Sequence, residues 1–231
     1  KGYPLIKQNR PKRKQVPKEN RCQLNKNWFL SAEEERDDRE GPSMAAGSPD
    51  DSKVSSEYNK IYFYSGVTRQ ENMQLNKLIL TTGQKMKSIE LCYQLPEPPK
   101  VYLHINSYGG SVFAGFASVD YIKNCPVPLV SIIDGCAASA ATIMSVVAKE
   151  RYMHEHAFML IHQLSSGMWG KFEDMKDDMK NNELLMKKII GIYQENTKLP
   201  KAKIAQILKK DLWWDAKTCL KYGLVDDIIT P

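Results

Sequence analysis

The chain has 231 residues, of which 42% are hydrophobic and 26% are charged, the balance of an ordinary globular protein. No stretch approaches the 18 consecutive apolar residues of a membrane-spanning helix, so we expect no membrane partner. Five widely spaced cysteines, without a Cys-x-x-Cys pair, favour free thiols over a disulfide framework or a zinc site.

The net charge of +6 is divided unevenly along the chain. Residues 1–30 carry nine Lys and Arg against one Glu, whereas residues 31–59 carry nine Asp and Glu against three Lys and Arg. The basic block at residues 10–14 is of a kind that binds nucleic acid, but such runs are more often solvated, and we rank nucleic acid last among partners. Opposed charges, prolines and small residues predict a disordered N-terminal extension at 1–57, followed by a folded domain at 58–231.

Within the folded domain, short apolar runs alternate with amphipathic segments. Strands are predicted at 61–64, 101–106, 129–133, 158–161 and 225–229. Helices are predicted at 72–93, 111–124, 138–149 and 172–196, with two short helices after the last. This alternation indicates βα crossovers and a largely parallel sheet, in which functional sites lie beyond the carboxyl ends of strands.

Three of these strand ends carry candidate site residues. Gly109 and Gly110 follow one strand, without the further glycines or the lysine of a phosphate-binding loop. Ser139 stands among small residues where a strand leads into a helix, which suits a nucleophile that forms an oxyanion. From this motif alone, a serine that caps the helix is the simpler explanation. His162 ends a third strand, as a general base or as an ordinary hydrogen-bonding residue.

Four motifs stand together in one order along the chain. They are Asn-Ser-Tyr-Gly-Gly-Ser-Val at 106–112, Gly-Cys-Ala-Ala-Ser at 135–139, Met-Leu-Ile-His-Gln at 159–163, and a segment from Asp-Ala to Leu-Val-Asp at 215–226. In this order the sequence resembles the proteolytic subunits of Clp protease over about residues 58–230. The resemblance implies an α/β protein with the ClpP/crotonase-like fold, a spiral of repeated ββα units with a protruding handle helix.

The resemblance also implies roles for five residues. Ser139 would be the nucleophile, His162 the general base and Asp211 the third member of a catalytic triad. The backbone N–H groups of Gly110 and Ala140 would hold the oxyanion. Spacing alone does not select the acid, for which other candidates are Asp134, Asp174, Asp177 and Asp178.

The implied function is that of a serine endopeptidase subunit in an ATP-dependent protease, which degrades unfolded polypeptides inside an oligomeric chamber. The partners would be further copies of the chain, as heptameric rings stacked into a tetradecamer, and an AAA+ Clp-type unfoldase. We expect no cofactor or metal in this subunit, because the partner ATPase would hydrolyse the ATP. The expected location is the cytoplasm, or the matrix or stroma of an organelle.

Three other functions remain open at this stage. The chain could be a non-catalytic or regulatory subunit of such a ring, although all three triad residues can be placed. It could be a crotonase-fold acyl-CoA enzyme, or a Ser–Lys hydrolase that uses Lys149. On a continuous helix, however, Lys149 would lie roughly 15 Å from Ser139, too far for direct proton transfer.

The sequence also departs from the family pattern. Tyr108 and Leu164 stand where the family usually has Pro, and Ala140 and Ala141 replace the usual Met-Gly. These changes predict altered substrate docking rather than altered chemistry. A cluster of apolar residues lies in and before the helix at 172–196, and its members are Met168, Trp169, Met175, Met179, Leu185, Met186, Ile189, Ile190 and Tyr193. Met168 and Trp169, which precede the periodic helix, predict a contact between subunits, whereas the later residues could equally face the core of the subunit itself.

Overall fold

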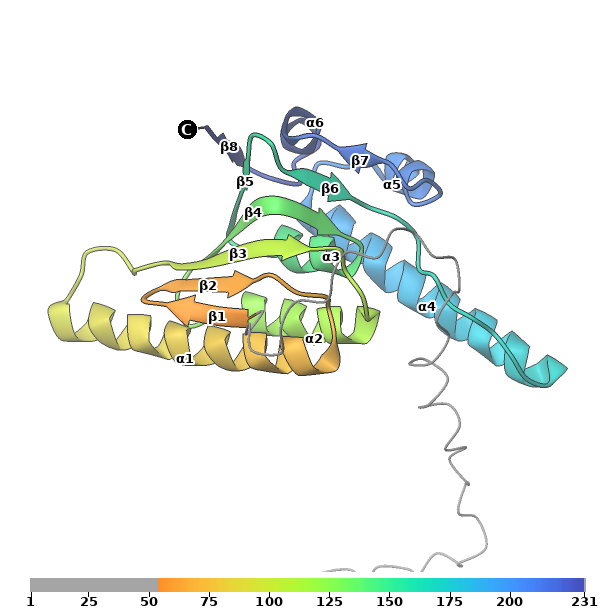
Figure 1. Ribbon diagram of the computed structural model, residues 1–231, viewed down its shortest axis with the longest axis horizontal. Coiled ribbons are helices and arrows are strands. Elements are labelled where there is room, and N and C mark those ends of the chain that lie inside the picture. The colour runs from red at the N-terminus through yellow and green to blue at the C-terminus, as the bar shows by residue number, and fades with distance from the viewer. Residues whose placement is uncertain (1–53, 231) are drawn as a thin grey trace, which may run out of the picture. The chain divides into compact units, whose positions relative to one another are not determined.

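The computed structural model describes residues 54–230, which fall within one compact unit (Figure 1). The extension predicted at 1–57 therefore lies outside the described residues, except for its last four. These four, Val54–Glu57, form strand β1 and pair with β2, so they belong to the folded domain and not to the extension. The physical reason is that Val54 is buried in the core, opposite Phe63.

The described residues form six helices and eight strands. The helices are α1 (Arg69–Tyr93), α2 (Val112–Lys123), α3 (Ala140–Val146), α4 (Phe172–Asn196), α5 (Lys201–Ile207) and α6 (Ala216–Lys221). The strands are β1 (Val54–Glu57), β2 (Lys60–Phe63), β3 (Val101–Ser107), β4 (Leu129–Ala138), β5 (Glu150–His154), β6 (Phe158–Leu160), β7 (Trp213–Trp214) and β8 (Asp227–Ile229). Every predicted helix and strand is present, and β1, β5 and β7 were not predicted.

The strands form one mixed sheet in the order β1-β2-β3-β4-β5-β8. Pairing is parallel from β2 to β8 and antiparallel only between β1 and β2 and between β6 and β7. Strand β4 is shared, because its first half pairs with β5 and its last residues, Cys136 to Ala138, pair with β6. Because β4 pairs first with β5 and then with β6, the chain follows the spiral of ββα units. The same pairing places the end of β6 beside the end of β4.

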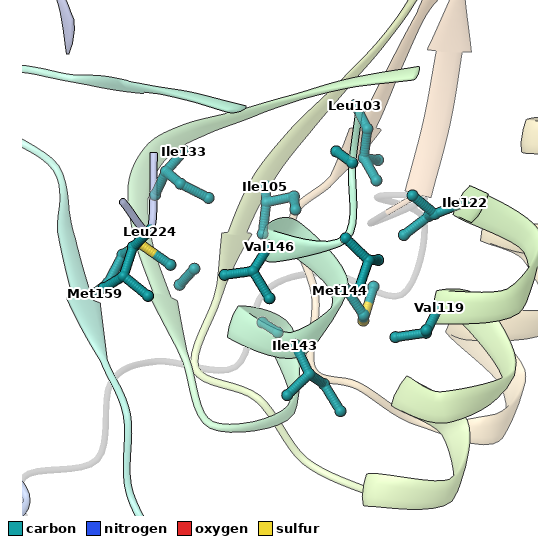
Figure 2. Close-up of a cluster of buried hydrophobic side chains, with 14 of the residues drawn as sticks. Leu103, Ile105, Val119, Ile122, Ile133, Ile143, Met144, Val146, Met159 and Leu224 are labelled. Atoms are coloured by element: carbon teal, nitrogen blue, oxygen red, sulfur yellow. The ribbon is translucent and has the colours of Figure 1, made fainter. Parts of the chain in front are cut away.

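The core lies between this sheet and the helices α1, α2 and α3, which cover one of its faces (Figure 1). Strand β3 shows the reason: its residues alternate between the two faces, and Val101, Leu103 and Ile105 are buried beneath the helices. Figure 2 shows Leu103 and Ile105 in one cluster with Met144 and Val146 of α3. Each such side chain contributes about 1.5–3 kcal/mol when fully buried, so this layer fixes the position of α3.

Helix α4 extends out of the body along most of its length (Figure 1). Its C-terminal part is anchored in the core by Ile189, Ile192 and Tyr193, which are all buried. Its N-terminal part carries exposed apolar side chains that the subunit does not cover. Helix α4 is the protruding handle helix that the resemblance implies. Among residues 54–230, no helix is both long and apolar enough to cross a bilayer.

The other face of the sheet carries a polar cluster around Asp134 at the middle of β4. Its carboxylate accepts a hydrogen bond from His104 Nδ1 at 2.9 Å and lies 3.3 Å from His154 Nε2. The Tyr64 hydroxyl donates to the same carboxylate. Burial alone would raise the pKa of Asp134, but the hydrogen bonds from His104 and Tyr64 outweigh it, and the pKa lies below its ordinary value. One carboxylate therefore ties together segments of β3, β4 and β5.

We predict that Asp134→Asn destabilises the fold by about 1–3 kcal/mol at neutral pH, because the partly buried His104 and the Tyr64 hydroxyl lose a charged hydrogen-bond partner. Since the folded-state pKa is depressed, this contribution is present above the ordinary pKa of about 3.9 and is lost as the pH falls through the folded-state value. Urea unfolding of both chains between pH 7 and pH 2.5 measures the difference. The exposed Glu155→Gln is the control, and an equal loss in both variants would contradict the prediction.

Candidate active site

Ser139 lies at the sharp junction between β4 and α3. Its φ of 54° and ψ of −125° are a conformation that a residue other than glycine adopts at a cost of about 1–3 kcal/mol. Its backbone N–H donates to the Leu160 carbonyl of β6 at 2.9 Å, which holds the junction to the neighbouring strand. The side chain occupies the N-cap position of α3 but makes no capping hydrogen bond. The capping explanation is therefore wrong, and the helix leaves the hydroxyl available.

Gly109 and Gly110 pack directly against this junction. A Cβ on Gly109, which has a φ of +93°, would lie 2.6 Å from both the Ala138 oxygen and the Ser139 Cβ. Gly110 pairs with Val67 in a parallel bridge, whose hydrogen bonds use the Gly109 carbonyl and the Ser111 N–H. The Gly110 N–H takes no part in that bridge. Glycine is required here because any side chain would occupy the space against which Ser139 rests.

His162 lies two residues after the end of β6, and its ring is held by the segment before β7. Nδ1 lies 3.0 Å from Oδ1 of Asp211. The Gln163 N–H donates to the Leu208 carbonyl at 2.8 Å and draws the two segments together. The His162 side chain is 28% exposed and that of Asp211 is 77% exposed, so the pair lies at the surface. Because a carboxylate only accepts, Nδ1 carries the proton in this contact, and in the neutral form of the ring Nε2 is then the nitrogen with a lone pair.

Ser139 and His162 line one cavity of about 200 Å³, together with Gly110 and Ala140. Ala140 is the first residue of α3, so its N–H has no partner within the helix. The rest of the lining is mainly apolar and comprises Ser111, Val112, Ile143, Gln163, Leu164, Ser165, Ile189 and Tyr193. The residues that carry a hydroxyl, an imidazole and two backbone amides therefore line one small space, and these are the groups that acyl transfer uses. Asp211 reaches this space only through His162.

The other candidate acids lie elsewhere. Asp134 binds His104 and His154 on the sheet, Asp174 accepts from the Lys171 N–H at the start of α4, and Asp177 pairs with Lys180. Asp178 also lies on α4, and of the five candidate acids only Asp211 contacts His162.

The lysine alternative is also separated from Ser139. Helix α3 ends at Val146, and the Lys149 N–H donates to the carbonyl of Leu129. Lys149 therefore lies beside the first residue of β4, whereas Ser139 follows the last one. The whole length of the strand separates the two residues, and Lys149 is not a base for Ser139.

Three of the departures from the family pattern lie at or beside this site, and one of them is Ala140, which lines the cavity. The exposed Tyr108 packs edge-on against Trp213, with ring centroids 6.3 Å apart, and Leu164 lines the cavity. The sequence did not predict that Thr142 and Tyr193 make hydrogen bonds beneath Ser139. Helical periodicity marks Tyr193 only as an apolar position, and it gives no sign of what the hydroxyl contacts. Among residues 54–230, no cluster of His, Cys, Asp and Glu could hold a metal ion.

Comparison with known proteins agrees with this architecture. The family model described as Clp protease matches residues 57–231. The ATP-dependent Clp protease proteolytic subunit 1 of Chlamydia trachomatis serovar D is 37% identical over 140 residues, 58% of this chain and 71% of the relative. The proteolytic subunit of Streptococcus mutans serotype c is 37% identical over 133 residues, 56% of this chain and 68% of the relative.

A further relative is proteolytic subunit 1 of Chlamydia caviae, which is 35% identical over 152 residues, 63% of this chain and 77% of the relative. The ββα spiral with its handle helix, together with these matches to Clp protease proteolytic subunits, defines the class of protein. The chain is a peptidase subunit. The chain belongs to the Clp protease family.

We predict that Gly109→Ala lowers stability by about 2–4 kcal/mol and peptidase activity at least tenfold. Alanine at a φ of +93° is strained, and its Cβ would push the Ser139 junction out of place. Thermal melting and a peptide-cleavage assay measure the two effects. Gly167→Ala, where an added Cβ meets no atom within 4 Å, is the matched control. Normal activity in Gly109→Ala would show that this close contact does not shape the site.

Proposed function

We propose that this chain is a serine endopeptidase, the proteolytic subunit of an ATP-dependent Clp-type protease. The observation that carries the proposal is that Ser139 and His162 line one cavity, while Nδ1 of His162 contacts the carboxylate of Asp211. In this proposal these three residues are the catalytic triad, and the Gly110 and Ala140 N–H groups hold the oxyanion. Besides the substrate and one water molecule, the proposed reaction uses only these side chains and amides.

The reaction proceeds in two halves. Ser139 Oγ bonds to the carbonyl carbon of the substrate while its proton passes to His162 Nε2, and the carbonyl oxygen becomes an oxyanion. The carbon–nitrogen bond then breaks, and His162 returns the proton to the leaving amine. In the second half, water gives a proton to His162 and attacks the acyl-enzyme, which releases the acid and restores Ser139. Asp211 keeps the imidazole in one tautomer and stabilises its charged form.

The lining of the cavity suggests which peptides fit. Val112, Ile143, Leu164 and Ile189 are apolar, and within residues 54–230 no Lys, Arg, Asp or Glu lines the cavity. An unpaired charge in such a space would lose its hydration, so the proposed preference is for an apolar side chain beside the cleaved bond. Unfolded polypeptides supply such side chains, which folded proteins bury.

Assembly into stacked rings is part of the proposal. A ring needs a contact between two different surfaces, and stacking needs a self-complementary one. Two groups of the exposed apolar side chains are used in this proposal: Met168, Trp169 and Phe172 near the tip of α4, and Met73 and Phe113 in a groove of about 390 Å³ between α1 and α2. Two exposed apolar surfaces of this kind suit two separate subunit contacts. We further propose an AAA+ unfoldase as the partner that hydrolyses ATP, and the cytoplasm or an organelle matrix or stroma as the location.

We predict that Ser139→Ala lowers cleavage of a fluorogenic peptide with Leu at the cleaved bond by at least about a thousandfold, with an unchanged fold. His162→Ala should cost about as much, and the double variant little more, because triad residues act as a unit. A fluorophosphonate probe should label the wild-type chain but not Ser139→Ala. Near-normal cleavage by Ser139→Ala would remove the proposed nucleophile. An unlabelled, inactive wild-type chain would favour a non-catalytic ring subunit.

We also predict a native mass many times that of the 26.4 kDa chain, and loss of the large species and of activity in Trp169→Asp. Trp169 is 98% exposed, so a charge there does not disturb the subunit core but opposes burial at a contact. Analytical ultracentrifugation and the peptide assay give the two measurements. Leu91→Asp, an exposed apolar residue on α1, is the control. A fully active monomer would contradict the assembly.

A further inference from the structure

A chain of buried hydroxyl groups runs from α4 to Ser139. The Thr142 hydroxyl, inside α3, donates to the carbonyl oxygen of Ser139 at 2.6 Å. The hydroxyl of Tyr193, from α4, contacts the same Thr142 oxygen. Thr142 and Tyr193 are both buried, with 0% and 2% of their surface exposed. Helix α4 is therefore linked to the nucleophile by hydrogen bonds as well as by packing.

The direction of these hydrogen bonds follows from the number of protons. Thr142 has one hydroxyl proton, which it donates to a carbonyl that can only accept. Tyr193 must therefore be the donor to Thr142. Burial raises the pKa of Tyr193 well above its ordinary value, so its phenol keeps the proton throughout the neutral range. Aligned donors polarise one another, and the bond to the Ser139 carbonyl is strengthened by the bond behind it.

Fixing the carbonyl of Ser139 also fixes the N–H of Ala140. The two groups belong to one planar trans peptide unit, so they point in opposite directions. The Thr142 N–H donates to the same carbonyl at 3.0 Å, and the two donors from Thr142 hold the oxygen on the side of α3. The Ala140 N–H therefore points away from Thr142, and Ala140 lines the cavity beside Ser139.

We propose that Tyr193 is a positioning residue, which acts through Thr142 to hold the Ser139–Ala140 peptide with its N–H directed at the oxyanion. This inference rests on the proposed function, because an oxyanion forms only if Ser139 attacks a carbonyl. The N–H contact is strongest in the transition state. A loss of positioning therefore lowers kcat and leaves KM nearly unchanged. A tyrosine that served only as packing in the core would have no such selective effect.

The test compares variants that remove one hydroxyl at a time. Tyr193→Phe should lower kcat about threefold to tenfold and Thr142→Val at least tenfold, with KM within twofold of wild type. The double variant should be no worse than Thr142→Val, since both hydroxyls act along one chain. Thr142→Ser, which keeps the hydroxyl, should restore most of the activity. Tyr152→Phe, which loses a tyrosine hydrogen bond to Glu150 on the sheet, is the matched control and should keep normal kcat.

A peptide aldehyde provides a readout that a merely structural role would not change. Ser139 Oγ adds to the aldehyde carbon, its proton passes to His162, and the aldehyde oxygen becomes the oxyanion. Aldehyde affinity should therefore fall by the same factor as kcat, whereas affinity for the matching product peptide stays constant. The expected result is this parallel fall in Tyr193→Phe and Thr142→Val, with melting temperatures that show both variants to be folded.

Each other outcome overturns the inference. Wild-type kcat and aldehyde affinity in Tyr193→Phe would show that its hydroxyl does not position the peptide. An equal loss of aldehyde and product-peptide affinity, with a lowered melting temperature, would assign Tyr193 to packing alone. If Thr142→Ser were as impaired as Thr142→Val, the hydroxyl chain would not be the cause. Failure of the proposed function itself is distinguished separately, by a wild-type chain without activity or by an active Ser139→Ala.

Discussion

The left-handed backbone at Ser139 is the constraint on which the rest of the site depends. The end of β4 must turn within one residue into α3, and this turn leaves the hydroxyl outside the helix it would otherwise cap. The strain is tolerated because the core holds both sides: β6 binds the Ser139 N–H, and Gly109 packs without a side chain against the same residue. The spiral sheet thus serves mainly to bring a third segment, with His162, beside a junction that would not persist alone.

The peptide unit between Ser139 and Ala140 connects the proposed active site to helix α4, which extends out of the body. The hydroxyls of Thr142 and Tyr193 reach the carbonyl of Ser139 from beneath, while the apolar side chains above it shape the cavity. Helix α4 is buried where it approaches this carbonyl and exposed where it leaves the body. Helix α4 therefore passes from an exposed N-terminal part to a buried C-terminal part.

Elements with a long, uninterrupted hydrophobic pattern were predicted well from the sequence. Short strands, and contacts between residues far apart in the sequence, were not. The helix at 172–196 has the predicted bounds because its amphipathic period continues without a break. Strand β5 was missed because only Met153 among its five residues is buried, so no apolar run marks it. At the site, motif and strand end indicated Ser139 and His162, but selecting Asp211 needed the family resemblance. The contact that joins Asp211 to His162 spans 49 residues, and local sequence holds no signal for it.

The exposure of Asp211 has a consequence for how the site responds to its surroundings. A carboxylate that is 77% exposed is screened by water, and such an ion pair contributes only about 0–1 kcal/mol. In an isolated chain the imidazole of His162 is therefore held in place only weakly. Anything that covers Asp211 without replacing its partner lowers the local dielectric constant and strengthens its hold on the imidazole. How firmly the His162 ring is held is then a property of the surface around the subunit as well as of the subunit itself.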